Sequence, residues 1–402
     1  MVRLLRRHTD LTQEAIAHLV GLSQGMVSRL ESGKRTLRDP DRRRRAWEGL
    51  EAPQPVLSAA PLLYGAEGLA EALVPSFRTV LDGEAAEKVR GTGLGSAGLG
   101  GRFGEGDLAR LRSARSHYEE MYRRVGGIPV RPRLARFLAT RVMPVLSASC
   151  TDEVGRRLFR TAGSLTALAG ICAYDARDQV LARKYFRAAL HMAKASGDRG
   201  FGGYVVALLA NQAMSMSRYP LVVQYTETAL GAGRGRLSPA LVSDLRSMQA
   251  RAYARLGDRA ACHEQMGLSE AAANRIRYGE EPSETSYVQP GLMETQFSEA
   301  LRRLGDLKAA EEYALESLET ADAAHLRGQV HRYAGLAVIR AQSGSADEAL
   351  EPAREALLRI RGVESGRLHD RIRSVQSALG RSSTPEVREF REQVDAELAL
   401  VL

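Results

Sequence analysis

Apolar residues recur with the period of an α-helix along nearly the whole chain. The first such stretch, residues 11–35, contains two short apolar stripes with a turn between them. The stripes consist of Ala15, Ile16 and Leu19, followed by Val27 and Leu30. Gly21 suits a left-handed turn position, and Thr12 and Ser23 suit the N-caps of the two helices. The pattern predicts two short helices joined by a tight turn, with Gly33 just after the second.

From residue 107 onward, amphipathic segments alternate with short breaks at Gly, Asp or Pro. Small residues recur in these segments about 40 residues apart, at Ala189, Ala229, Ser269, Ser317 and Ala356. The insertion Tyr278–Pro290 accounts for the widest spacing. Small residues let paired helices approach closely, and stacked pairs bury a continuous core. The sequence therefore predicts an all-α fold whose helical hairpins stack into a right-handed α-solenoid.

Two stretches interrupt the helical pattern and indicate domain boundaries. Residues 53–61 contain three prolines, which break helices. Residues 91–106 are rich in glycine and include a Gly-x-Gly-x-x-Gly spacing, but no β-rich run precedes it and no βαβ unit surrounds it. We interpret this segment as a connecting loop and not as a dinucleotide site. The predicted organisation is a small domain at 1–53, a connecting region at 54–106 and a repeat domain at 107–402.

Positive charge is concentrated at the N-terminus. The formal net charge is +9, and residues 1–46 hold eleven Lys or Arg against five Asp or Glu. Two-thirds of the excess therefore lies in a small part of the chain. Localised positive charge of this kind indicates a polyanionic partner for the N-terminal domain.

The second predicted helix presents hydrogen-bonding side chains on its outer face. When Val27 and Leu30 point to the core, the outward positions are Gln24, Gly25, Ser28 and Arg29. In a major groove, Gln pairs bidentately with adenine and Arg with guanine. Phosphate contacts are expected from Gln13, Lys34 and Arg35, with Arg3, Arg6 and Arg7 as further candidates. Double-stranded DNA is the expected partner.

The pattern L-T-Q-E-x-x-A-x-x-x-G-x-S-x-x-x-V-S-R-x-E-x-G, which starts at Leu11, resembles the Cro-type helix-turn-helix regulators, also called the XRE family. The resemblance covers roughly residues 2–53. It implies that Gln13 and Ser23 contact the DNA backbone, and that Gln24, Ser28 and Arg29 face the bases. A single such domain buries little surface on DNA, so we expect a homodimer joined through the helical region.

The repeats of residues 150–362 resemble tetratricopeptide (TPR) repeats, although they are longer than the usual length of roughly 34 residues. The resemblance implies a concave groove lined by the first helix of each pair. By this resemblance, the residues expected to line the groove are Tyr174, Tyr204, Asn211, Arg251 and Arg302. An XRE-type domain with a TPR-like array resembles regulators that bind a signal peptide or small-molecule effector, and the high Ala, Gly and Arg content is actinobacterial in character.

Other functional classes find little support in the sequence. The three cysteines are far apart and match neither a disulfide framework nor a metal site, so we expect buried, reduced thiols. No catalytic or metal-binding motif stands in a suitable context, and we expect neither enzyme activity nor a cofactor. No signal peptide or membrane span is evident, which predicts a cytoplasmic protein. The alternative is a TPR-like protein adaptor with a DNA-tethering N-terminal module. Repressor and activator roles, the operator sequence and the effector's identity stay open.

Overall fold

The computed structural model describes residues 13, 17, 22–32, 104–147, 151–320, 326–380 and 384–399. Across these residues every regular element is a helix, which confirms the predicted all-α fold. The chain divides into two compact units, Met1–Val74 and Pro75–Leu402, and we describe each by itself. Most of the predicted first helix, the closing segment after Ser32 and the connecting region up to residue 103 lie outside the described residues.

In the first unit, helix α3 spans Gln24–Glu31, where the second helix was predicted. Ser23 holds the N-cap position with extended backbone, and its carbonyl accepts from the N–H groups of Met26 (2.9 Å) and Val27 (3.1 Å). The Ser23 hydroxyl makes no capping hydrogen bond, so the prediction was right for the position and wrong for the side chain. Val27 is buried, as the apolar pattern requires, and Ala17 is buried as well.

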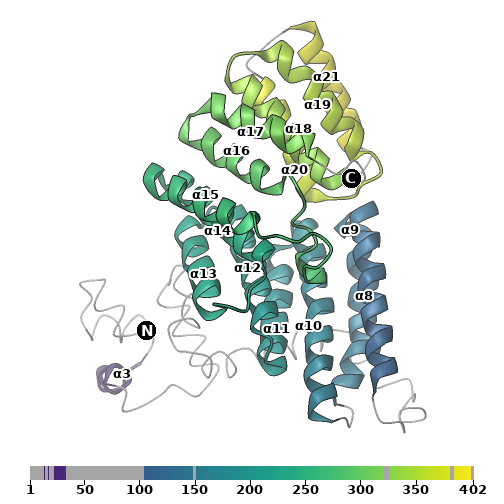
Figure 1. The fold of residues 1–402 in the computed structure, drawn as a ribbon, viewed down its shortest axis with the longest axis vertical. Helices are drawn as coiled ribbons and strands as arrows, with labels where there is room; N and C mark the ends of the chain where they lie inside the picture. The colour runs from purple at the N-terminus through teal and green to yellow at the C-terminus, as the bar shows by residue number, and fades with distance from the viewer. Residues whose placement is uncertain are drawn as a thin grey trace. The chain divides into compact units, whose positions relative to one another are not determined.

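The second unit is an array of antiparallel helical hairpins (Figure 1). Its first described helices are α8 (Glu105–Val125) and α9 (Gly127–Phe137), and α9 continues into the short segments η1 (Leu138–Val142) and η2 (Met143–Ser147). The hairpins that follow pair α10 (Asp152–Asp175) with α11 (Gln179–Ser196), α12 (Arg199–Ser215) with α13 (Tyr219–Ala232), α14 (Pro239–Leu256) with α15 (Arg259–Ala273), α16 (Leu292–Leu304) with α17 (Leu307–Glu319), α18 (Leu326–Gln342) with α19 (Ala346–Ile360), and α20 (Gly366–Leu379) with α21 (Pro385–Ala399). This confirms the predicted stack of helical hairpins.

The Gly-Asp breaks form the turns of this array. A glycine in the left-handed conformation ends one helix, and an aspartate then accepts the N–H of the residue three positions later. The glycines are Gly197, Gly257 and Gly305, and the aspartates are Asp198, Asp258 and Asp306. Between the turns, small residues such as Ala349, Ala353 and Ala356 are fully buried. The turns and the close helix packing thus follow from residues that the sequence pattern identifies.

The first helices of successive hairpins lie next to one another, from α10 to α20, and the last hairpins return to the beginning of the array. The buried carboxylate of Asp175, at the end of α10, forms an ion pair with Arg327 of α18. The same carboxylate accepts from the Ser365 hydroxyl (2.7 Å) and from the Gly127 N–H (2.8 Å). These contacts join residues far apart in sequence, so the array is curved until its two ends meet.

Backbone hydrogen bonds support the same junction. The N–H of Glu364 donates to the carbonyl of Val125 (2.9 Å), and the N–H of Ile128 donates to the carbonyl of Glu364 (3.3 Å). Gly126 lies between these segments with φ of 90°, and a side chain there would meet the backbone of Glu364. Both left-handed backbone and close approach therefore require glycine at this position.

Candidate nucleic-acid interface and ligand sites

Helix α3 presents the face that the sequence predicts for base contacts. Gln24, Gly25, Ser28 and Arg29 are all exposed, whereas Val27 is completely buried. Positions 24, 25, 28 and 29 share one side of a helix because of its 3.6-residue period. A side chain at Gly25 would lie 4.0 Å from an Arg29 guanidinium nitrogen, so glycine leaves a low surface beside this cation. The face can therefore approach another surface closely.

The predicted phosphate contacts are only partly described. Ser23 is exposed at the start of α3, and its hydroxyl is not used for capping. Gln13 lies in a helix and is half-buried. Lys34, Arg35, Arg3, Arg6 and Arg7 lie outside the described residues. The DNA-contacting roles of all these residues stay predictions.

The two tyrosines predicted for the concave groove are buried. The Tyr174 hydroxyl donates to the carbonyl oxygen of Asn211 (3.2 Å), and the Arg367 guanidinium lies 4.3 Å from the centre of the Tyr174 ring. The Tyr204 ring packs between those of Phe201 and Tyr287, and burial raises its pKa well above the ordinary value. Tyr174 and Tyr204 can contact an effector only if the array opens.

The predicted arginines lie around a different group, the carboxylate of Glu299 on α16. Arg251 pairs with Glu299 at 2.7 Å, and the charge of Arg302 also acts on this carboxylate. Arg302 is half-buried and donates to Gln342 (3.2 Å). The structure thus brings Tyr174 and Asn211 together, and Arg251 and Arg302 together, while Tyr204 lies with neither pair. Their effector-binding role stays a prediction.

The insertion Tyr278–Pro290 packs against helices of the array. The sequence analysis did not predict this packing. Glu284 is buried and accepts from Arg160 of α10 (2.8 Å) and Ser164 of α10 (2.7 Å). The Tyr287 hydroxyl donates to Asp244 of α14 (2.6 Å). The one available clue was Tyr287-Val288, an apolar pair within a polar stretch. The insertion therefore links α10 and α14 across the array.

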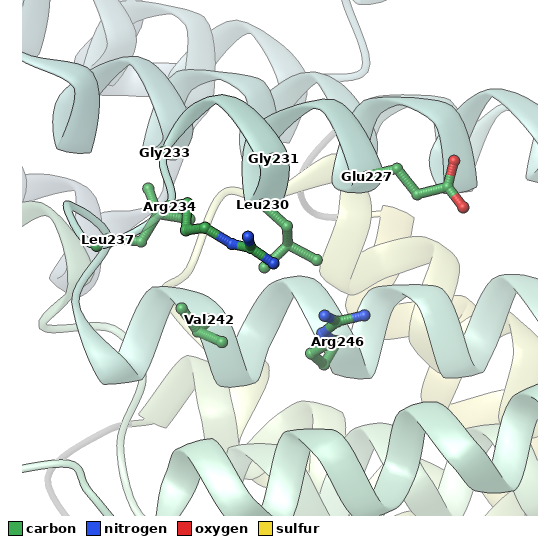
Figure 2. A pocket seen from close by; sticks show the side chains of 9 residues that line it. Glu227, Leu230, Gly231, Gly233, Arg234, Leu237, Val242 and Arg246 are labelled. Atoms are coloured by element: carbon green, nitrogen blue, oxygen red, sulfur yellow. The ribbon is translucent and has the colours of Figure 1, made fainter.

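A separate, open pocket lies between the end of α13 and the start of α14. Figure 2 shows Leu230 and Arg234 extending into the space between the two helices, with Val242 and Arg246 on α14. Arg246 also donates to Gln265 (2.8 Å). The pocket thus combines aliphatic side chains with two cations and the carboxylate of Glu227. The sequence analysis made no prediction for this pocket.

Two further predictions concern cysteines and membranes. Cys172 and Cys262 are buried free thiols, as expected, and burial raises the pKa of Cys172 to about 12. Cys150 lies outside the described residues. None of the described helices has the length and apolar character needed to cross a bilayer.

Comparison with known proteins supports the reading of the first unit. Residues 2–60 match a protein-family model described as a helix-turn-helix domain. A comparison with curated proteins found no match. The matched range includes α3 and every residue predicted to contact DNA. The chain therefore contains a helix-turn-helix domain, which supports a DNA-binding regulator.

Proposed function

We propose that this protein is a sequence-specific, DNA-binding transcription regulator of XRE type that acts in the cytoplasm. The observation that carries the proposal is the exposed face of α3 within a matched helix-turn-helix domain. Gln24 and Arg29 carry the side chains that pair bidentately with adenine and guanine. We expect the Ser23 hydroxyl, which makes no capping hydrogen bond, to donate to a phosphate oxygen at the helix start.

The TPR-like array is proposed to dimerise the protein and to sense a peptide or small-molecule effector. Dimerisation follows from the small DNA surface that one helix-turn-helix covers. For a small molecule, we favour the open pocket of Figure 2, because Tyr174 and Tyr204 are buried. Effector binding must favour one of two array conformations if it is to change operator affinity.

Fluorescence anisotropy tests the DNA-binding proposal. The full-length protein is titrated against its own upstream promoter region and against scrambled DNA at near-physiological salt. Arg29→Ala should weaken promoter binding by about tenfold or more, because a bidentate base contact contributes roughly 1–3 kcal/mol. The matched control is Arg388→Ala, an exposed arginine of α21, which should bind like the wild type.

The salt dependence and the scrambled DNA complete the test. Promoter binding should fall steeply as salt rises, because phosphate contacts release counterions. Equal, weak binding to both DNAs, unchanged by Arg29→Ala, would contradict the proposal and favour the protein-adaptor function.

A further inference from the structure

We propose that the array contains a buried anion-binding site between α16, α18 and α20, centred on Arg332 and Arg371. The site takes one small anion or one acidic group of a larger molecule, such as a carboxylate or phosphate oxygen. It lies away from the pocket of Figure 2 and makes no use of the helix-turn-helix domain.

The geometric basis is a narrow, partly open cavity. Arg332 and Gly335 of α18 line it together with Glu299 and Arg302 of α16, Ser317 of α17 and Arg371 of α20, so its wall carries three cations and one carboxylate. Gly335 makes space for a guanidinium, since a Cβ there would lie 3.3 Å from Nη2 of Arg371. The cavity has room for about one water-sized group. A monatomic anion or a single oxyanion oxygen fits this size.

The second observation is a set of buried donors without acceptors. Arg332 is only 4% exposed, and its Nη2 donates to the carbonyl of Pro290 (2.8 Å). Its Nε and Nη1 have no hydrogen-bond partner, and neither has Nε of Arg371. Buried polar groups in proteins are nearly always paired, so unpaired guanidinium N–H groups at a cavity indicate a missing acceptor.

The charge balance selects an anion over a water molecule. Glu299 is already shared by Arg251 (2.7 Å), Arg255 (3.8 Å) and Arg371 (3.9 Å). Arg302 and Arg332 add two further cations at this cavity, and the carboxylate that acts on Arg332 is Glu294. Cations therefore outnumber carboxylates around the cavity. Water can accept a hydrogen bond there, but only an anion offsets the charge.

The pKa values of these arginines agree with this balance. Burial lowers the pKa of Arg302, and the neighbouring charge of Arg371 lowers it further. Burial likewise lowers the pKa of Arg332 and of Arg371. The protein's own carboxylates thus offset the positive charges of these arginines only in part. A bound anion would offset the remaining charge.

Thermal unfolding of the full-length protein without DNA tests the site. Chloride is exchanged for bulky isethionate at constant ionic strength, with acetate and phosphate as separate arms. A ligand that binds only the folded state raises the unfolding temperature with concentration. We expect the temperature to rise by several degrees with at least one of the small anions in the wild type and in the exposed control Arg388→Met, but not in Arg332→Met.

The arms also identify the source of the anion. A rise with chloride or phosphate indicates a free inorganic ion, and a rise with acetate alone indicates the carboxylate of a larger molecule. Equal anion responses in Arg332→Met and Arg388→Met, or no response in the wild type, would overturn the proposal. If Arg332→Met does not fold, anomalous scattering from wild-type crystals soaked separately in bromide and in selenate decides, because a cavity that is empty in both soaks would overturn the site. Failure of operator binding would leave each of these outcomes unchanged.

Discussion

At the scale of single residues, Glu284 is the carboxylate that ties the insertion to α10. Burial alone would raise its pKa, but the hydrogen bonds and charge of Arg160, with help from Arg115 and Ser164, lower the pKa to about 2. The ordinary value is 4.5, so the folded state holds the ionised form more strongly than the unfolded state does. The folded protein is therefore stabilised by ionised Glu284.

The sign of this shift predicts how stability changes with pH. Because the folded pKa is depressed, the contribution of Glu284 is complete above about pH 5 and is lost as the pH falls toward about 2. Its full size is roughly 3 kcal/mol at 1.36 kcal/mol per pKa unit. In urea unfolding between pH 6 and pH 3, Glu284→Gln should lose less stability on acidification than the wild type. The exposed control, Glu386→Gln, should keep the wild-type pH slope, and the same slope in both variants would contradict the assignment.

At this scale the sequence predicted correctly which side chains are exposed and which are buried wherever the helical period alone determines this. The outward positions of Gln24 and Arg29 follow from the burial of Val27, and all three were predicted correctly. It failed where a side chain's partner comes from a distant segment. Tyr204 is a residue type expected in a binding groove, yet its ring packs against that of Tyr287 in the insertion. The residues next to Tyr204 in the sequence give no indication of this contact.

At the scale of elements, the Gly-Asp turns are the features that the sequence predicts most directly. Gly257 has φ of 82° and ends α14, and the Asp258 carboxylate accepts from the N–H of Ala261 (3.0 Å) at the start of α15. Both roles need these residue types, since glycine tolerates the left-handed region and a short carboxylate reaches the free N–H groups. The local sequence is therefore sufficient to define this turn.

The N-cap of α15 supports a stability prediction. Asp258→Ala removes an acceptor from a free helix N–H and should lower the free energy of unfolding by about 1 kcal/mol. Asp258→Ser keeps a capping oxygen and should recover most of that loss. Chemical denaturation of the two variants beside the wild type measures both effects. Equal losses in the Ala and Ser variants would show that charge, and not capping, is the contribution of this residue.

The insertion marks the limit of prediction for elements. The repeat spacing reveals that residues 278–290 are extra, but a period cannot say where an extra segment packs. Its position depends on pairs such as Tyr287 with Asp244, which come from different hairpins. Such contacts depend on the three-dimensional curvature of the array, which a one-dimensional pattern does not contain.

At the scale of the second unit as a whole, the sequence predicted stacked hairpins but not the meeting of the array's two ends. Asp175 and Arg327 are separated by 152 residues and look like ordinary charged residues at helix ends. In the structure, their side chains are 0% and 7% exposed. A buried ion pair is costly to form but is very destabilising to break, because one charge is left without a partner. Substitutions in this pair therefore test most directly whether the two ends of the array meet.

Asp175→Asn should lower the free energy of unfolding by about 3–5 kcal/mol, because it leaves the Arg327 guanidinium buried and unpaired. Asp370→Asn is the matched control: its pair with Arg177 (3.2 Å) also joins the ends of the array, but both side chains are about half exposed. Exposed pairs contribute about 0–1 kcal/mol, so this variant should be nearly neutral. Adding Arg327→Met to Asp175→Asn removes the unpaired charge and should recover part of the loss, as a double-mutant cycle in urea would show. If Asp175→Asn costs no more than Asp370→Asn, then Arg327 reaches water in solution, and the two ends of the array do not stay closed.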